Sequence, residues 1–182
     1  RENFDPALSD RAAALKKRLI EADISKYGQI RNEIKLADKS RYKVLVAGQV
    51  EDDRSICTGG AGMTNLELLA RARAREPDAH IIYKPHPDVV AGHRKGYVET
   101  TDALRFADEI QHNAAITSLI DAVDGVHVIT SLAGFEALLR GKAVTTHGVP
   151  FYAGWGLTKD LGAVPARRTR RLSLDELVAG TL

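Results

Sequence analysis

The sequence predicts an α/β fold, with a Rossmann-like parallel sheet and helices on both of its faces. Short apolar runs, each bounded by polar residues, glycine or proline, alternate along the chain with segments of helical spacing. Runs that are apolar throughout are typical of strands buried on both faces, which occur mainly in parallel sheets. The chain has 182 residues, 44% of them hydrophobic, which is enough to bury one sizeable core.

Local signals place the individual elements. Strands are expected over residues 43–48, 79–84, 126–130 and 143–146, and helices over residues 64–75, 116–123, 131–140 and 172–182. An irregular loop is expected over residues 88–101. Before the first strand, apolar residues at helical spacing predict a helix from residue 5, and Lys26-Tyr27-Gly28 predicts a break before a weaker helical stretch that ends near residue 37.

We therefore divide the chain into a helical lead-in, residues 1–40, and a Rossmann-like lobe, residues 41–182. The chain opens on Arg1 and enters a helical pattern at once, so we expect it to be part of a longer protein.

Composition narrows the class of function. The formal net charge is +2, and no Lys/Arg run is interleaved with aromatic residues, which argues against a nucleic-acid partner. No apolar stretch approaches the roughly 20 residues that cross a bilayer. Cys57 is the single cysteine, so it forms no internal disulfide and belongs to no cysteine metal cluster. These features predict a cytoplasmic protein.

Parallel sheets bind ligands outside the carboxyl ends of their strands, so the residues directly after each strand are the candidates for a site. The first strand is followed by Gln49 and by three consecutive acids, Glu51, Asp52 and Asp53. Such a cluster is either a solvated turn or part of a site, and its position favours a site. The glycine-rich residues 58–62 then form either a phosphate cradle or a flexible loop.

The second strand runs into Lys84-Pro85-His86-Pro87. The prolines stiffen the backbone on which a cation and an imidazole are placed. Lys84 is suited to neutralise a phosphate, and His86 to donate a hydrogen bond or a proton to a leaving oxygen. The alternative is a proline turn with two exposed polar side chains.

The third strand leads into Thr130-Ser131-Leu132-Ala133-Gly134-Phe135-Glu136, in which small hydroxyl residues and a glycine open a helix. Such a helix start attracts an anion. Ser131 can cap the helix and contact phosphate, while Glu136 can accept hydrogen bonds from a ribose diol. Alternatively, Ser131 is only an N-cap and Glu136 only a first-turn acid.

The last strand leads into a segment dense in aromatic residues and glycines, residues 151–158, which forms either a wall against a base or sugar or a lid over the sheet edge. Four clusters thus converge on one edge of the sheet. The residues predict a domain that binds a phosphorylated, nucleotide-linked small molecule.

Four motifs in this order resemble the capsule polysaccharide biosynthesis family, the KpsC-type retaining β-Kdo glycosyltransferases. They are Gln49-Val50-Glu51-Asp52-Asp53-Arg54-Ser55, Lys84-Pro85-His86-Pro87, Thr130-Ser131-Leu132-Ala133-Gly134-Phe135-Glu136-Ala137-Leu138 and Phe151-Tyr152-Ala153-Gly154-Trp155-Gly156-Leu157-Thr158. The resemblance is firm over residues 41–160.

The resemblance implies one lobe of a two-lobed GT-B glycosyltransferase, whose second lobe this chain lacks. It also implies the nucleotide-sugar donor CMP-Kdo (Kdo is 3-deoxy-manno-octulosonate) and a lipid-linked sugar acceptor, in capsular polysaccharide synthesis at the inner face of the cytoplasmic membrane. Retention of configuration requires a covalent intermediate or attack from the same face. The arginines at positions 167, 168, 170 and 171 either contact anionic lipid there or form a solvated basic face.

The family pattern Q-x-x-x-D matches Gln49 and Asp53, which implies that Asp53 is the catalytic carboxylate and that Gln49 orients it or the sugar. In the other motifs, the resemblance implies that Lys84, His86 and Ser131 stabilise the leaving phosphate, with His86 also catalytic. Glu136 would hold the ribose, and Gly134 belongs to the same donor-binding motif. Neither a metal nor a cofactor is implied.

Two other functions remain open at this point. A CDP-glycerol-type phosphotransferase also uses a nucleotide donor and a histidine-proline element, but it would not need Gln49 and Asp53. A non-catalytic sugar-nucleotide-binding or polysaccharide export module would bind through the same clusters without reacting.

Overall fold

A six-stranded parallel sheet forms the centre of the computed structural model, which describes residues 5–24, 34, 36 and 40–182. The strands are β1 (Lys43–Ala47), β2 (His80–Lys84), β3 (Glu109–Ile110), β4 (Gly125–Val128), β5 (Ala143–Thr146) and β6 (Lys159–Asp160). Their order across the sheet is β3-β2-β1-β4-β5-β6, and every neighbouring pair is parallel. This is the order of a doubly wound nucleotide-binding fold, so the predicted Rossmann-like α/β class is confirmed.

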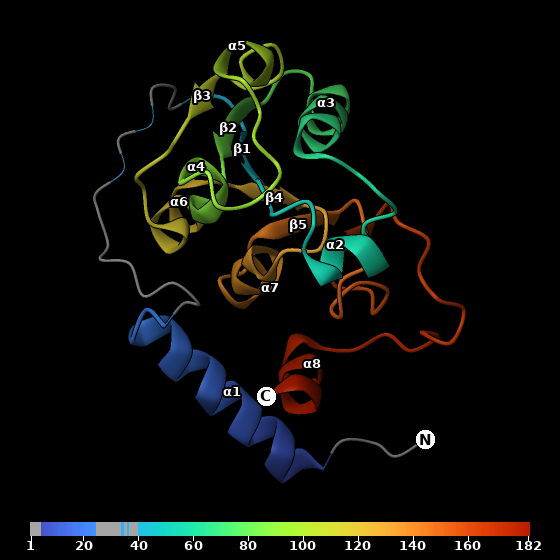
Figure 1. Cartoon of the computed structure of the whole chain (residues 1–182). Coiled ribbons are helices and arrows are strands. Elements are labelled where there is room, and N and C mark those ends of the chain that lie inside the picture. Colours follow the sequence, from blue (N-terminus) through green and yellow to red (C-terminus); the bar gives the residue numbers. More distant parts are fainter. Residues whose placement is uncertain (1–4, 25–33, 35, 37–39) are drawn as a thin grey trace.

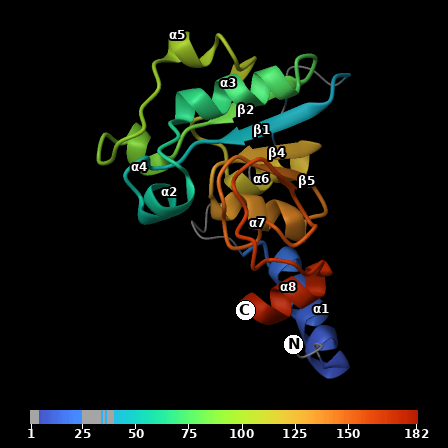
Figure 2. The ribbon, with the colours of Figure 1, turned by 90° about the vertical axis from the view of Figure 1, so that its right-hand side faces the viewer.

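Helices cover both faces of the sheet (Figures 1 and 2). The helices of the described residues are α1 (Pro6–Glu21), α2 (Arg54–Gly59), α3 (Asn65–Arg75), α4 (Pro87–Val90), α5 (Thr100–Ala103), α6 (Ile116–Ala122), α7 (Leu132–Leu139) and α8 (Leu174–Thr181). In Figure 2, α3 lies on one side of the sheet and α6 and α7 on the other, with the packed pair α1 and α8 beyond α7.

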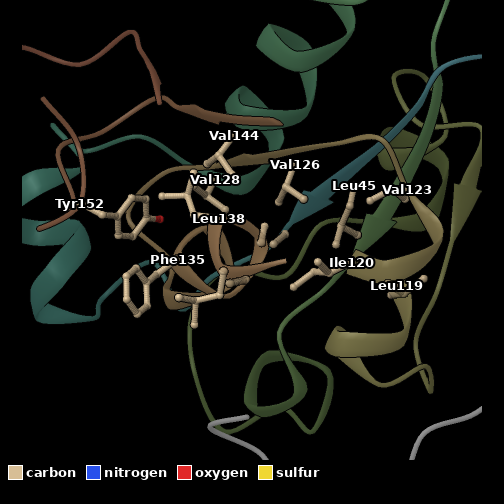
Figure 3. Packing of buried hydrophobic residues seen from close by; sticks show 14 of the residues in the cluster. Leu45, Leu119, Ile120, Val123, Val126, Val128, Phe135, Leu138, Val144 and Tyr152 are labelled. Carbon is tan, nitrogen blue, oxygen red and sulfur yellow. The ribbon is translucent and has the colours of Figure 1, made fainter. Parts of the chain in front are cut away.

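Alternation along β1 explains why its sequence is apolar throughout. Val44 and Val46 belong to a buried cluster with residues of α3, while Leu45 and Ala47 face the opposite cluster, formed with α6 and α7. Figure 3 shows the second cluster, in which the strand side chains Leu45, Val126 and Val128 face Leu119, Ile120, Phe135 and Leu138. Both faces of β1 are therefore buried from solvent.

The lead-in helix α1 is tied to the sheet domain at its carboxyl end. The buried Arg140 side chain, 4% exposed, donates from Nη2 to Asp23 Oδ1 at 3.1 Å, and Thr117 Oγ1 donates to Asp23 Oδ2 at 3.3 Å. These contacts join α1 to α6 and α7. The weaker helical stretch expected after the break at residues 26–28 lies, apart from residues 34 and 36, outside the described residues.

Several short elements differ from the sequence prediction. Residues 88–101 were expected to form an irregular loop, but α4 extends into this segment and α5 begins within it. Neither α2, with six residues, nor the two-residue strands β3 and β6 were predicted. Elements this short contain too little of a helical or strand period for the pattern to register.

No helix among the described residues combines the length and apolarity needed to cross a membrane.

The core predicts a clear difference between two leucines. Leu45 is fully buried, so Leu45→Ala should lower the free energy of unfolding by about 2–5 kcal/mol, through lost burial and a residual cavity. Leu104 is 49% exposed, and Leu104→Ala should change it by less than about 0.5 kcal/mol. Urea unfolding measures both, and equal losses would contradict the assignment of Leu45 to the core.

Candidate functional site

A pocket of about 480 Å³ lies at the carboxyl ends of β1, β2 and β4. Its lining comes from residues 47–50, 53 and 55 at the end of β1, residues 84–88 at the end of β2, and residues 130–133 and 136 after β4, with Arg94, Ile116 and Phe151. In the sheet, β1 pairs with β2 on one side and β4 on the other. The strand order reverses there, and this is where doubly wound folds bind their ligands.

The structure brings most of the predicted site residues together. Six of the seven line the pocket: Gln49, Asp53, Lys84, His86, Ser131 and Glu136. The seventh, Gly134, lies outside the lining residues.

Asp53 stands at the amino end of α2 and is exposed to solvent. Its Oδ1 accepts hydrogen bonds from the backbone N–H of Ser55 at 2.9 Å and from the hydroxyl of Ser55 at 2.7 Å. An aspartate that caps a helix in this way has a defined orientation. The carboxylate is thus held at the rim of the pocket.

Gln49 is buried and joins the end of β1 to the end of β4. Its Oε1 accepts from the backbone N–H of Ile129 at 3.2 Å and of Thr130 at 2.8 Å, and its Nε2 donates to Thr130 Oγ1 at 3.1 Å. Both ends of the amide are therefore engaged by the segment that opens the site, which holds the two strand ends in register.

Lys84 is the last residue of β2 and is only 5% exposed. Its Nζ donates to the carbonyl oxygen of His112 at 3.2 Å, and it forms no ion pair with a carboxylate of the described residues. Burial lowers the pKa of this ammonium group, because a low-dielectric environment disfavours the charged form. A bound anion would restore the lost stabilisation of the cation.

His86 caps α4, where the prolines on both sides fix the backbone. Its Nδ1 accepts the backbone N–H of Asp88 at 3.2 Å, so the neutral ring carries its proton on Nε2. This tautomer makes Nε2 the donor atom of the imidazole.

Helix α7 begins at the pocket with Ser131 as its N-cap. Ser131 Oγ accepts the backbone N–H of Ala133 at 3.2 Å, and Glu136, 7% exposed, lines the pocket one turn further along. The positive end of the helix dipole thus faces the same space as Lys84.

Gly134 has a packing role in this arrangement. A Cβ there would collide with the hydroxyl of Tyr152, which is fully buried and donates to the carbonyl oxygen of Ser131 at 2.5 Å. The absence of a side chain lets the aromatic segment pack under the start of α7. Phe151 contacts the Tyr152 ring and lines the pocket, so this segment supplies both a core side chain and a pocket wall.

The loop after β1 is organised by residues that sequence reasoning did not assign. Asn65 Oδ1 accepts the backbone N–H of Gln49, and its Nδ2 donates to the carbonyl oxygens of Gln49 and Gly96. Glu51 accepts the backbone N–H of Asn65 at 2.7 Å. In the sequence, Asn65 is recognisable only as the start of a helix, and no local pattern indicates its hydrogen bonds to the loop after β1.

Two further polar residues at the site were not predicted. Arg94 lines the pocket and donates to Asp52 Oδ1 at 3.0 Å, which explains one of the consecutive acids. Thr130 lines the pocket beside Gln49, and its position directly after an apolar strand was the sequence signal that could have identified it.

The glycine-rich residues 58–62 contribute nothing to the lining of the pocket: Gly59 accepts the backbone N–H of Val149, and Gly60 caps the end of α2.

Part of the arginine cluster supports the loop after β5. Arg168 Nη1 donates to the carbonyl oxygens of Pro150 and Ala153, and its guanidinium lies 5.5 Å from the centre of the Trp155 ring.

Among the described residues, no group of three or more His, Cys, Asp or Glu side chains is arranged to hold a metal ion.

Curated proteins with related sequences match all or most of the chain. It is 50% identical over 182 residues to the capsule polysaccharide modification protein LipA of Neisseria meningitidis serogroup A, covering 100% of this chain and 26% of that protein. It is 49% identical over 146 residues to the lipopolysaccharide-processing protein LpsZ of Rhizobium meliloti, covering 80% of this chain and 33% of that protein. The chain thus spans about a quarter to a third of these relatives.

Among the solved structures that share the fold are two of KpsC from Thermosulfurimonas dismutans. The β-Kdo 2,7 transferase superposes with a TM-score of 0.80 at 42% identity, over 99% of this chain and 55% of that one. The β-Kdo 2,4 transferase gives a TM-score of 0.83 at 34% identity, over 97% and 56%. The predicted fold class, one Rossmann-like lobe of the GT-B type, is confirmed by these matches.

The family model for capsule polysaccharide biosynthesis proteins matches residues 5–181. The match takes in the pocket at the ends of β1, β2 and β4, and also α1 and α8. The chain therefore belongs to the capsule polysaccharide biosynthesis family.

Proposed function

We propose that this chain is the donor-binding lobe of a glycosyltransferase that transfers Kdo from CMP-Kdo, with retention of configuration, to a lipid-linked acceptor in capsular polysaccharide synthesis. One observation carries the proposal. At the switch point of the sheet, a buried lysine without a carboxylate partner among the described residues lines the same pocket as an oriented aspartate. A ligand that carries both an anionic group and an electrophilic carbon could contact the lysine with the first and the aspartate with the second.

The phosphate of CMP is the anion we assign to Lys84. Desolvated charge pairs are strong because the surrounding dielectric is low. The N-cap Ser131 and the positive end of α7 add to the attraction, while Nε2 of His86 supplies a hydrogen bond to the phosphate oxygen that leaves the sugar. Glu136 is the acceptor we assign to the ribose hydroxyls.

Asp53 is the nucleophile in this proposal. Its carboxylate attacks the anomeric carbon of Kdo, the bond from that carbon to the phosphate oxygen breaks, and CMP leaves with the electron pair. The acceptor hydroxyl then attacks the same carbon, loses its proton to a base, and releases the carboxylate. Two inversions give retention.

The comparisons support this proposal through the proteins they match. Both solved structures are β-Kdo transferases, and this chain covers 55% and 56% of them, which leaves room for the second lobe that a GT-B enzyme requires. In the full-length transferase, meaning this chain joined to that second lobe, the acceptor would approach across the cleft, at the inner face of the cytoplasmic membrane.

Nucleotide binding tests the donor. Titration calorimetry should show that the chain prefers CMP to UDP and to CDP-glycerol, and that cytidine, which lacks the phosphate, binds at least about tenfold more weakly than CMP. Preference for CDP-glycerol would favour a phosphotransferase instead. If no nucleotide binds, the donor-binding role is wrong.

Lys84 should control the affinity for CMP and its dependence on pH. Lys84→Met removes the cation at similar volume and should weaken CMP binding about tenfold or more. Because binding uses the ammonium form, the wild-type affinity should fall as pH rises through the pKa of Lys84, which burial places below the ordinary value of 10.5. The variant should lack this fall.

The matched control is Lys43→Met, at the opposite, amino end of β1. It should bind CMP as the wild type does over the same pH range. Equal losses in the two lysine variants would remove Lys84 from the phosphate site.

Asp53→Asn should separate binding from reaction. In the full-length transferase, it should lower the rate of Kdo transfer by about a thousandfold or more, because an amide is a poor nucleophile. Its dissociation constant for CMP should stay within about threefold of the wild type, since CMP lacks the sugar that Asp53 attacks. Transfer at the wild-type rate would exclude Asp53 as nucleophile.

A further inference from the structure

We propose that Ser55 and Thr130 are positioning residues for Asp53, which they orient through a continuous, one-directional chain of hydrogen bonds that begins at the buried amide of Gln49. This inference rests on the proposed role of Asp53 as nucleophile and assigns the means by which that carboxylate is held.

The chain of hydrogen bonds consists of three contacts between side chains from two segments, the one after β1 and the one after β4. Gln49 Nε2 lies 3.1 Å from Thr130 Oγ1, and Thr130 Oγ1 lies 3.2 Å from Ser55 Oγ. Ser55 Oγ in turn lies 2.7 Å from Asp53 Oδ1. All four side chains line the pocket.

The direction of the chain is set by the chemistry at its two ends. A carboxylate has no proton to donate, so Ser55 must give its single hydroxyl proton to Asp53 and must itself accept from Thr130. Thr130 then has no proton left for Gln49 and must accept from it.

The inner end independently requires the same direction. Gln49 Oε1 faces the backbone N–H groups of Ile129 and Thr130, which fixes the amide so that its NH₂ group points to Thr130 Oγ1. The two ends therefore agree, and no hydroxyl in the chain has an equivalent alternative orientation.

The inner half of the chain is rigid. Gln49 is 6% exposed and Thr130 9% exposed, and Asn65 holds the backbone of Gln49 by both its N–H and its carbonyl group. The methyl group of Thr130 packs closely at Gly148, where an added Cβ would lie 3.0 Å from it. The outer half, Ser55 and Asp53, is exposed, so the chain transmits the order of the core to a carboxylate at the surface.

Such a chain would act in both chemical steps. In the first, it fixes Asp53 Oδ1 and so limits the rotation of the attacking carboxylate. In the second, the carboxylate leaves the sugar and regains its charge, which the hydroxyl of Ser55 stabilises by donating to Oδ1. The chain therefore affects turnover, while CMP binding depends on other residues.

The test uses the full-length transferase with Ser55→Ala, Thr130→Val and the double variant. Thr130→Val keeps the packed methyl group and replaces the hydroxyl by a second methyl group, and Thr130→Ser, which keeps the hydroxyl, is the conservative control. Each single variant should lower kcat for Kdo transfer about tenfold or more and leave the dissociation constant for CMP within about threefold of the wild type. Thr130→Ser should retain most of the activity.

Two readouts separate positioning from a merely structural effect. Ser55→Ala removes a hydrogen bond to the ionised carboxylate of Asp53, and Thr130→Val removes the donor that orients the Ser55 hydroxyl. The acidic limb of the kcat profile should therefore shift to higher pH in both single variants, and further in Ser55→Ala. The kcat of the double variant should lie within about threefold of the kcat of the slower single variant, because either change breaks the same chain of hydrogen bonds. An acidic limb that stays in place, or fully multiplicative losses, would overturn the inference.

The outcome also distinguishes this inference from the proposed function. A wild-type full-length protein that transfers no Kdo from CMP-Kdo would overturn the function and this inference with it. An active wild type whose Ser55→Ala and Thr130→Val variants match it in kcat would overturn the inference alone. If Thr130→Val fails to fold, Ser55→Ala, an exposed change, still decides the result.

Discussion

The parallel pairing of β1 with β4 is the interaction on which the site depends. It places Leu45 opposite Val126 and Val46 opposite His127, so the two strands end side by side and their loops leave the sheet at one point. Gln49 then bonds the loop after β1 to the backbone after β4. The pocket is therefore a consequence of the strand order, and the residues that line it are held by the same contacts that hold the sheet.

Lys84 is a charged group whose burial is unfavourable in the absence of a ligand. Burying the ammonium of Lys84 beside a backbone carbonyl, with no carboxylate partner among the described residues, lowers its pKa and disfavours the cation. A fold retains such a group readily when a ligand supplies the missing charge. Asp53 differs, because it is exposed and its orientation comes from Ser55 and the start of α2. In the proposed function, donor binding by Lys84 and reaction at Asp53 thus rest on separate supports within one pocket.

The sequence predicted the four longer strands and most of the residues that follow them into the pocket, because local apolar runs mark buried strands. Apolar runs such as residues 43–48 mark strands buried on two faces, and the strand order brings the residues after β1, β2 and β4 to one edge. The long-range polar contacts were not predictable in this way. The partners of Asn65 and the pairing of Arg94 with Asp52 join segments 14 to 42 positions apart, and neither residue lies in a strand-end pattern. Gly134 was assigned to donor binding from its motif, whereas its place in the structure reflects the packing of Tyr152.

A crystal structure of the chain with CMP bound tests the central claim most directly. The account predicts the phosphate within hydrogen-bonding distance of Lys84 Nζ and of the start of α7, with the carboxylate of Asp53 facing the side of the phosphate where the sugar would be attached. A nucleotide bound elsewhere on the molecule, or a phosphate in the pocket that leaves Lys84 bound only to the carbonyl of His112, would contradict it.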